Sequence, residues 1–117
     1  MLRASAAAQN ISVNLDAVTN PKLDSGITHG SELLAFADAV TGSDHAAIIA
    51  ARTALRDCMG PGALVEAAAI AGNFSKNDRA SNAMGIPLES VFLADTADFR
   101  ERLGIDGFQS ARNTLGS

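Results

Sequence analysis

The chain has 117 residues, 47% of them hydrophobic, and carries a net charge of −4 with one cysteine. This length suits one domain that can bury a core without disulfides or metals. The nine basic residues are scattered along the sequence, so no cluster could neutralise a run of phosphates. We therefore expect no nucleic-acid partner.

The sequence also argues against a membrane or secreted protein. No apolar run approaches the roughly 18 residues of a membrane span. The segment from Met1 to Ala8 lacks the long apolar region of a signal peptide. A single cysteine excludes an internal disulfide, which agrees with a reducing compartment. We expect a cytoplasmic protein with no membrane association.

Residues 1–28 show no helical periodicity and are predicted to form an extended N-terminal arm. Ile11, Val13 and Leu15 alternate with polar residues, a pattern that allows a short strand. A single strand is not stable without a partner, so the arm is expected to lie against helices formed by residues 29–117, the predicted domain.

Helices are predicted for most of residues 29–117, because the sequence lacks Trp and Tyr and has many small aliphatic residues. The first should span residues 31–41, with Ser31 as N-cap and Gly42 at its end. The second begins after a Ser43 cap and stops at Gly60. The last covers residues 96–103, with Asp95 as its cap and Gly104 after its end. The fold class is all-α.

The central predicted helix covers residues 62–84, and Gly85 and Pro87 mark its end. Within residues 63–71 every residue except Glu66 is apolar, so this half is expected to be buried almost all round. A core-facing row at helical spacing continues into polar residues; its members are Ala63, Ala67, Ile70, Phe74, Asn77, Ser81 and Met84. Gly72 indicates a close approach by another backbone, since glycine inside a helix usually has a packing reason.

Residues 68–88 contain Ile70-Ala-Gly-Asn-Phe74, then Asp78-Arg79, then Gly85-Ile-Pro-Leu88. This stretch resembles the C-terminal helix of alkylhydroperoxidase D-like (AhpD-like) proteins, the carboxymuconolactone decarboxylase superfamily. Residues 33–41 resemble the preceding helix in the peroxidase-related branch. The family usually has Asn-Arg where this chain has Asp78-Arg79. The resemblance implies an AhpD-like helical bundle.

Peroxidase-active members of that family use a Cys-x-x-Cys motif with a histidine one turn on, and this chain has no such motif. The leading hypothesis is therefore a non-catalytic AhpD-like module for assembly or small-ligand binding. The alternative is a peroxidase-related antioxidant enzyme that uses Cys58, or thiols from a partner chain carrying the missing Cys-x-x-Cys half. A third possibility is a truncated remnant of a longer enzyme.

Three residues with reactive or ligating side chains are interpreted as structural. Cys58 is expected to be buried and unreactive, since free cysteine is among the most buried residue types, and it stays a weak catalytic candidate. His29 and His45 lack a partner at metal-ligand spacing, so both are expected to be solvated or to cap helices. No cofactor or metal is predicted.

The one predicted site is a polar cluster at the end of the central helix, formed by Asn77, Asp78, Arg79 and Asn82. It is either a solvated helix end or a ligand or subunit pocket. In the second case Arg79 would hold a carboxylate, from a neighbour's side chain or from a small acid, through two parallel hydrogen bonds.

Self-association is also predicted. Three or four helices cannot cover a segment such as residues 63–71 that is apolar on nearly every side. We expect a homo-oligomer, with a dimer as first choice, because two-fold assemblies are the commonest.

Overall fold

The computed structural model describes residues 2–116, with side chains from residue 5 onward. The chain is mostly helical and no strand occurs among the described residues, which confirms the all-α prediction. It divides into two compact units, Met1–Asn73 and Phe74–Ser117. Across the described residues, no helix is both long and apolar enough to cross a membrane.

The predicted arm lies in the first unit and is not extended throughout. It begins with α1 (Leu2–Ala8), and the segment with alternating apolar residues leads into a 3-10 turn, η1 (Leu15–Val18), instead of a strand. Asn14 explains this turn, because its side chain accepts a hydrogen bond from Asp16 N at 3.1 Å. Ala17, only 2% exposed, lines a small pocket together with Leu34 of α2, so this part of the chain lies beside the helix.

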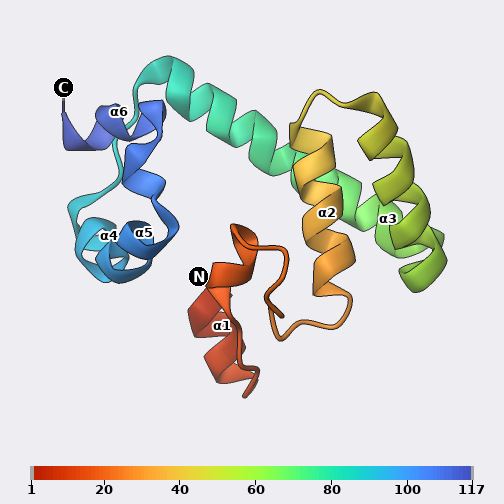
Figure 1. Cartoon of the computed structure of the whole chain (residues 1–117). Helices are drawn as coiled ribbons and strands as arrows, with labels where there is room; N and C mark the ends of the chain where they lie inside the picture. Colours follow the sequence, from red (N-terminus) through yellow and green to blue (C-terminus); the bar gives the residue numbers. More distant parts are fainter. Residues whose placement is uncertain (1, 117) are drawn as a thin grey trace. The chain divides into compact units, whose positions relative to one another are not determined.

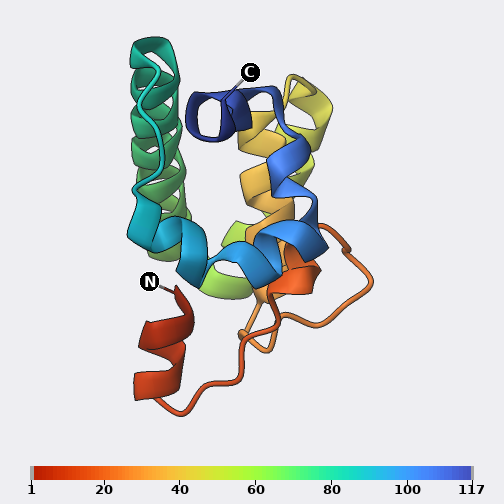
Figure 2. The same ribbon diagram turned by 90° about the vertical axis from the view of Figure 1, so that its left-hand side faces the viewer.

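Two helices, α2 (Gly30–Thr41) and the first part of α3 (His45–Met84), form a helical hairpin in the first unit (Figure 1, Figure 2). Gly42 ends α2 as predicted, and its N–H donates to Asp38 O at 3.0 Å. The connection between the helices is therefore very short.

Both predicted N-caps of this hairpin are wrong. His29, in a left-handed conformation, occupies the N-cap position of α2, so Ser31 already lies inside the helix. Asp44, not Ser43, caps α3, because its Oδ1 accepts from Ala46 N at 2.9 Å and from Ala47 N at 3.3 Å. Two residues able to cap stood side by side in the sequence, and the carboxylate is the one that reaches the free amides.

The predicted break at Gly60 is present inside α3. Gly60 has φ 88° and ψ 169°, a non-helical conformation that separates two helical segments. Pro61 follows it and has no N–H to donate, so the helical hydrogen-bond ladder is interrupted here. The chain changes direction at this point (Figure 1). The second segment ends at Met84, where Gly85 takes φ 67°, again as predicted.

The core of the first unit is small. The large side chains in it are Phe36 of α2, 4% exposed, and Leu55 of α3, which is fully buried. The other buried apolar residues are alanines: Ala6, Ala17 and Ala39. Alanines let helices approach closely but contribute little apolar area each.

The apolar half of the central helix is not buried, contrary to expectation. Val65 is 68% exposed, Ile70 59% and Phe74 58%. Ala63, Ala67 and Ser81 are partly covered, so the small members of the predicted row are shielded and its large apolar members are not. Nothing lies within 4 Å of a Cβ built on Gly72, so no other backbone of the described chain approaches this glycine.

The second unit follows the end of α3 with short helices. They are α4 (Ser90–Asp95), α5 (Ala97–Leu103), η2 (Ile105–Gly107), η3 (Gln109–Ala111) and α6 (Arg112–Leu115). Gly104 ends α5 with φ 66° as predicted, but Thr96 and not Asp95 is its N-cap. An ion pair of 3.2 Å joins Arg100 and Asp106 across this bend. None of residues 74–116 is buried.

Candidate functional site

A polar cleft of about 550 Å³ lies in the second unit, between the end of α3 and the start of α6. Two long-range hydrogen bonds hold its walls together. Asn113 Nδ2 donates to Asn82 Oδ1 at 2.9 Å, and Leu88 N donates to Thr114 Oγ1 at 2.7 Å. The lining residues are Asp78, Ser81, Asn82, Ile86, Pro87, Leu88, Ser110, Asn113 and Thr114. We call this site the polar cleft.

Two of the four residues of the predicted polar cluster line the polar cleft. Asp78 and Asn82 line it, whereas Asn77 and Arg79 do not. Helical spacing explains the division: Asp78 and Asn82 are four residues apart and share a face, while Asn77 and Arg79 are each turned about 100° away from Asp78.

Arg79 is exposed, and no ion pair joins it to any residue between 2 and 116. Within the described chain it therefore has no carboxylate to hold. An ion pair with another subunit stays a prediction.

Cys58 is exposed, contrary to the expectation of a buried thiol. It lies in the last turn before the Gly60 break, and its Sγ–H donates to Leu55 O at 3.4 Å. The fully buried Leu55, three residues earlier, anchors this turn of the helix on the core. Burial was expected from the residue type, but Cys58 itself is exposed, while Ala47 and Ala51 on the same side of α3 are partly covered.

The structure brings His29 and Glu32 to this thiol. One ligand atom of each of the three residues lies within 4.8 Å of the other two. His29 and Glu32 stand three residues apart at the start of α2, while Cys58 comes from α3. We call these three residues the His-Glu-Cys cluster. His29 is thus not simply solvated, and its side chain makes no capping hydrogen bond.

The carboxylate of this cluster is held in its charged form. The Ser31 hydroxyl donates to Glu32 Oε2 at 2.8 Å, and this hydrogen bond is the main reason why the pKa of Glu32 is lowered from 4.5. A backbone hydrogen bond and the charge of His29 lower the pKa further. Both effects favour a carboxylate over a carboxylic acid at neutral pH.

The turn before α2 fixes the backbone of His29, which has φ 55°. Gly30 N donates to Ile27 O at 2.8 Å, and Ile27 N donates to Ser25 Oγ at 3.2 Å. Gly30 is buried, and a Cβ on it would lie 2.0 Å from Ser25 Oγ. A left-handed conformation persists at a non-glycine residue only when its surroundings determine it, and this tight turn does so.

Sequence reasoning missed the His-Glu-Cys cluster. The local signal, His29 three residues before Glu32 at a helix start, was present, since residues three apart are neighbours on a helix. The position of Cys58, which follows after a helix connection, depends on how α2 and α3 pack. No spacing rule gives that.

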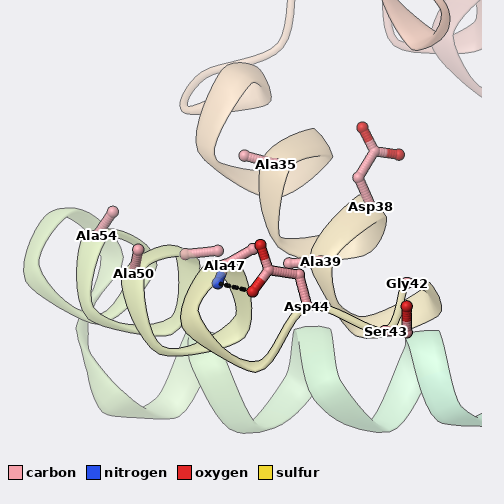
Figure 3. A pocket seen from close by; sticks show the side chains of 10 residues that line it. Ala35, Asp38, Ala39, Gly42, Ser43, Asp44, Ala47, Ala50 and Ala54 are labelled. Atoms are coloured by element: carbon pink, nitrogen blue, oxygen red, sulfur yellow. Dashed lines mark hydrogen bonds between the residues drawn. The ribbon is translucent and has the colours of Figure 1, made fainter.

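A second cavity in the first unit is lined mainly by small side chains. It has a volume of about 620 Å³ and lies between α2 and the first part of α3 (Figure 3). Its alanines are Ala35, Ala39, Ala47, Ala50, Ala51 and Ala54. Asp44, the N-cap of α3, also lines it, but its carboxylate is hydrogen-bonded to backbone amides of its own helix (Figure 3). Asp38 and Ser43 are the other polar side chains that line this groove (Figure 3).

No protein-family model, curated protein or solved structure matches the chain. The AhpD-like resemblance of residues 33–41 and 68–88 therefore rests on those residues alone.

Proposed function

We propose that the protein is a non-catalytic helical module that binds a small polar ligand in the polar cleft. The observation that carries this proposal is the convergence of polar side chains from two separate segments, residues 78–82 and 110–114, on one cleft. The AhpD-like resemblance implies a module of this kind without the redox motif, and that family assignment is part of the proposal.

The lining favours a ligand that donates hydrogen bonds, in particular a small amine. Asp78 supplies a carboxylate, and Ser81, Ser110 and Thr114 supply hydroxyl groups. No Lys or Arg lines the cleft, so a carboxylate ligand would meet no opposite charge there. The net charge of −4 also favours cations over anions near the surface. This proposal replaces the alternative in which Arg79 holds a small acid, because Arg79 does not line the polar cleft.

The experiment is a titration of the ¹⁵N-labelled protein with matched pairs of small amines and carboxylic acids, followed by amide shifts. Amines should move the signals of residues 78–88 and 110–114, and the matching acids should not. Asp78→Asn should abolish the effect. Glu66→Gln, an exposed carboxylate on the same helix outside the cleft, should leave it unchanged. Equal shifts in Asp78→Asn and the parent protein would refute the proposal.

A second candidate function is thiol chemistry at Cys58, which the exposure of this residue and the nearby imidazole of His29 favour. In this proposal the Cys58 thiolate attacks a peroxide oxygen, the O–O bond breaks, and an alcohol leaves after protonation. The sulfenic acid is then reduced by two outside thiols, which yield water and a disulfide. Trapping of a sulfenic acid by dimedone after peroxide treatment, absent in Cys58→Ser, would support this candidate. No trapped product would exclude it.

A further inference from the structure

We propose that the His-Glu-Cys cluster binds one Zn²⁺ ion. An imidazole nitrogen of His29, a carboxylate oxygen of Glu32 and the sulfur of Cys58 all lie within 4.8 Å of one another. This site belongs to the first unit and the polar cleft to the second. Zinc binding and the proposed ligand function can therefore be tested separately.

The ligand set selects the metal. Mg²⁺ and Ca²⁺ prefer oxygen ligands alone, whereas a set of one sulfur, one nitrogen and one oxygen is typical of Zn²⁺. Three protein ligands leave the fourth tetrahedral position for water. Such an open site can bind a further small molecule, unlike a site closed by four side chains.

The distances require only a small adjustment. Bond lengths of about 2.0 to 2.3 Å place the ligand atoms of tetrahedral zinc roughly 3.5 Å apart. The three atoms, now within 4.8 Å of one another, would have to approach by roughly 1.3 Å at most. His29 and Cys58 are exposed, so rotation of their side chains can provide this movement without repacking the core.

The surroundings fix the Glu32 carboxylate and the backbone positions of His29 and Cys58. Ser31 occupies Oε2 of Glu32, which leaves the other carboxylate oxygen for the ion. The tight turn of residues 25–30 determines the backbone of His29. Cys58 follows the buried Leu55 by one turn. An outer hydrogen bond such as that from Ser31 to Glu32 orients a metal ligand and raises the affinity of a site.

The neighbouring carboxylate makes an ion pair of its own. Asp57 directly precedes Cys58, but its Oδ1 accepts hydrogen bonds from Arg56 Nε and from an Arg56 terminal nitrogen, both at 3.2 Å. The charge of Asp57 is thus balanced by its own neighbour. Glu32 is left as the carboxylate of the site.

The first measurement uses the full chain, freed of metal with a chelator under reducing conditions and titrated with Zn²⁺ in competition with a chromophoric chelator. One Zn²⁺ should bind per chain. Cys58→Ser and His29→Asn should each weaken binding by more than the roughly 10- to 100-fold that loss of an outer partner causes. Asparagine is chosen at position 29 because it tolerates the left-handed conformation. His45→Asn, at the exposed start of α3, should bind like the parent chain.

The second measurement replaces Zn²⁺ by Co²⁺, whose bond to a thiolate gives a charge-transfer absorption band. Cys58 is the only cysteine, so the band must report on this residue even if a variant fails to fold. No Zn²⁺ binding, half an ion per chain, the absence of the band, or equal affinity in His29→Asn and the parent chain would each overturn the proposal.

Discussion

At the scale of single residues, the clearest electrostatic interaction is the hydrogen bond that the Ser31 hydroxyl donates to the Glu32 carboxylate. It stabilises the charged form, so its contribution to folding is present above pH 4.5 and is lost as the pH falls through the lowered pKa. We expect Ser31→Ala to raise the pKa of Glu32 towards 4.5. Ser31→Thr keeps a hydroxyl and should raise it less. Carboxyl ¹³C shifts measured against pH give the value, and an unchanged pKa in Ser31→Ala would disprove the assignment.

Arg79 provides the second residue-scale prediction. It is exposed and makes no ion pair within the described chain, so Arg79→Ala should change the free energy of unfolding by only about 0 to 1 kcal/mol. Arg52→Ala, another exposed arginine on α3, is the control for loss of positive charge. Thermal melting at several protein concentrations is the measurement. A loss of several kcal/mol that depends on concentration would instead place Arg79 in a partly buried pair with another subunit.

At the scale of elements, the break inside α3 can be tested with two nearby glycines. Gly60, with φ 88° and ψ 169°, occupies a region that is essentially restricted to glycine. Gly60→Ala should therefore destabilise the protein by about 1 to 3 kcal/mol. Gly62 lies in helix with nothing within 4 Å of its Cβ position, so Gly62→Ala should stabilise by up to about 1 kcal/mol. Urea unfolding followed by circular dichroism measures both, and effects of the same sign would contradict the proposed break.

The elements also show what the sequence could predict. The helix ends at Gly42, Gly60, Met84 and Leu103 are set by local backbone chemistry, and all were predicted from glycine and proline. The helix starts were not, because the N-caps are His29 instead of Ser31 and Asp44 instead of Ser43, and the incoming loop decides which residue caps. The same loop holds His29, so the conformation of one of the three residues of the His-Glu-Cys cluster depends on a turn that helical periodicity does not predict.

The polar cleft was predictable in part for a similar reason. Asp78 and Asn82 belong to one helix face, which spacing gives directly. The opposite wall, Ser110, Asn113 and Thr114, lies on η3 and α6. No helices were predicted there, because each has only three or four residues.

At the scale of the whole molecule, the apolar surface of α3 supports the predicted self-association. Val65 and Ile70, both more than half exposed, lie on different sides of the helix, so no single stripe of the described chain would cover them. Sedimentation velocity should show a dimer or larger assembly at micromolar concentration. Ala68→Arg, at an exposed position among these side chains, should weaken it, whereas Thr53→Arg on the first part of α3 should not. If the parent chain sediments as a compact monomer, this prediction is wrong.

The two ends of residues 12–26 contact each other, and this contact determines where the segment between them could change in length. Asn14 N donates to Ser25 O at 3.0 Å, and a Cβ on Gly26 would lie 2.1 Å from Ser12 O, so the ends of this segment meet as a closed loop. The entropy lost on closing a flexible loop grows only with the logarithm of its length, by about 0.6 kcal/mol for each doubling. Related chains could therefore lengthen the exposed tip at residues 19–22 at little thermodynamic cost. Where the two ends meet, by contrast, the backbone of Ser12 leaves no room for a side chain at position 26, so related chains should keep glycine there.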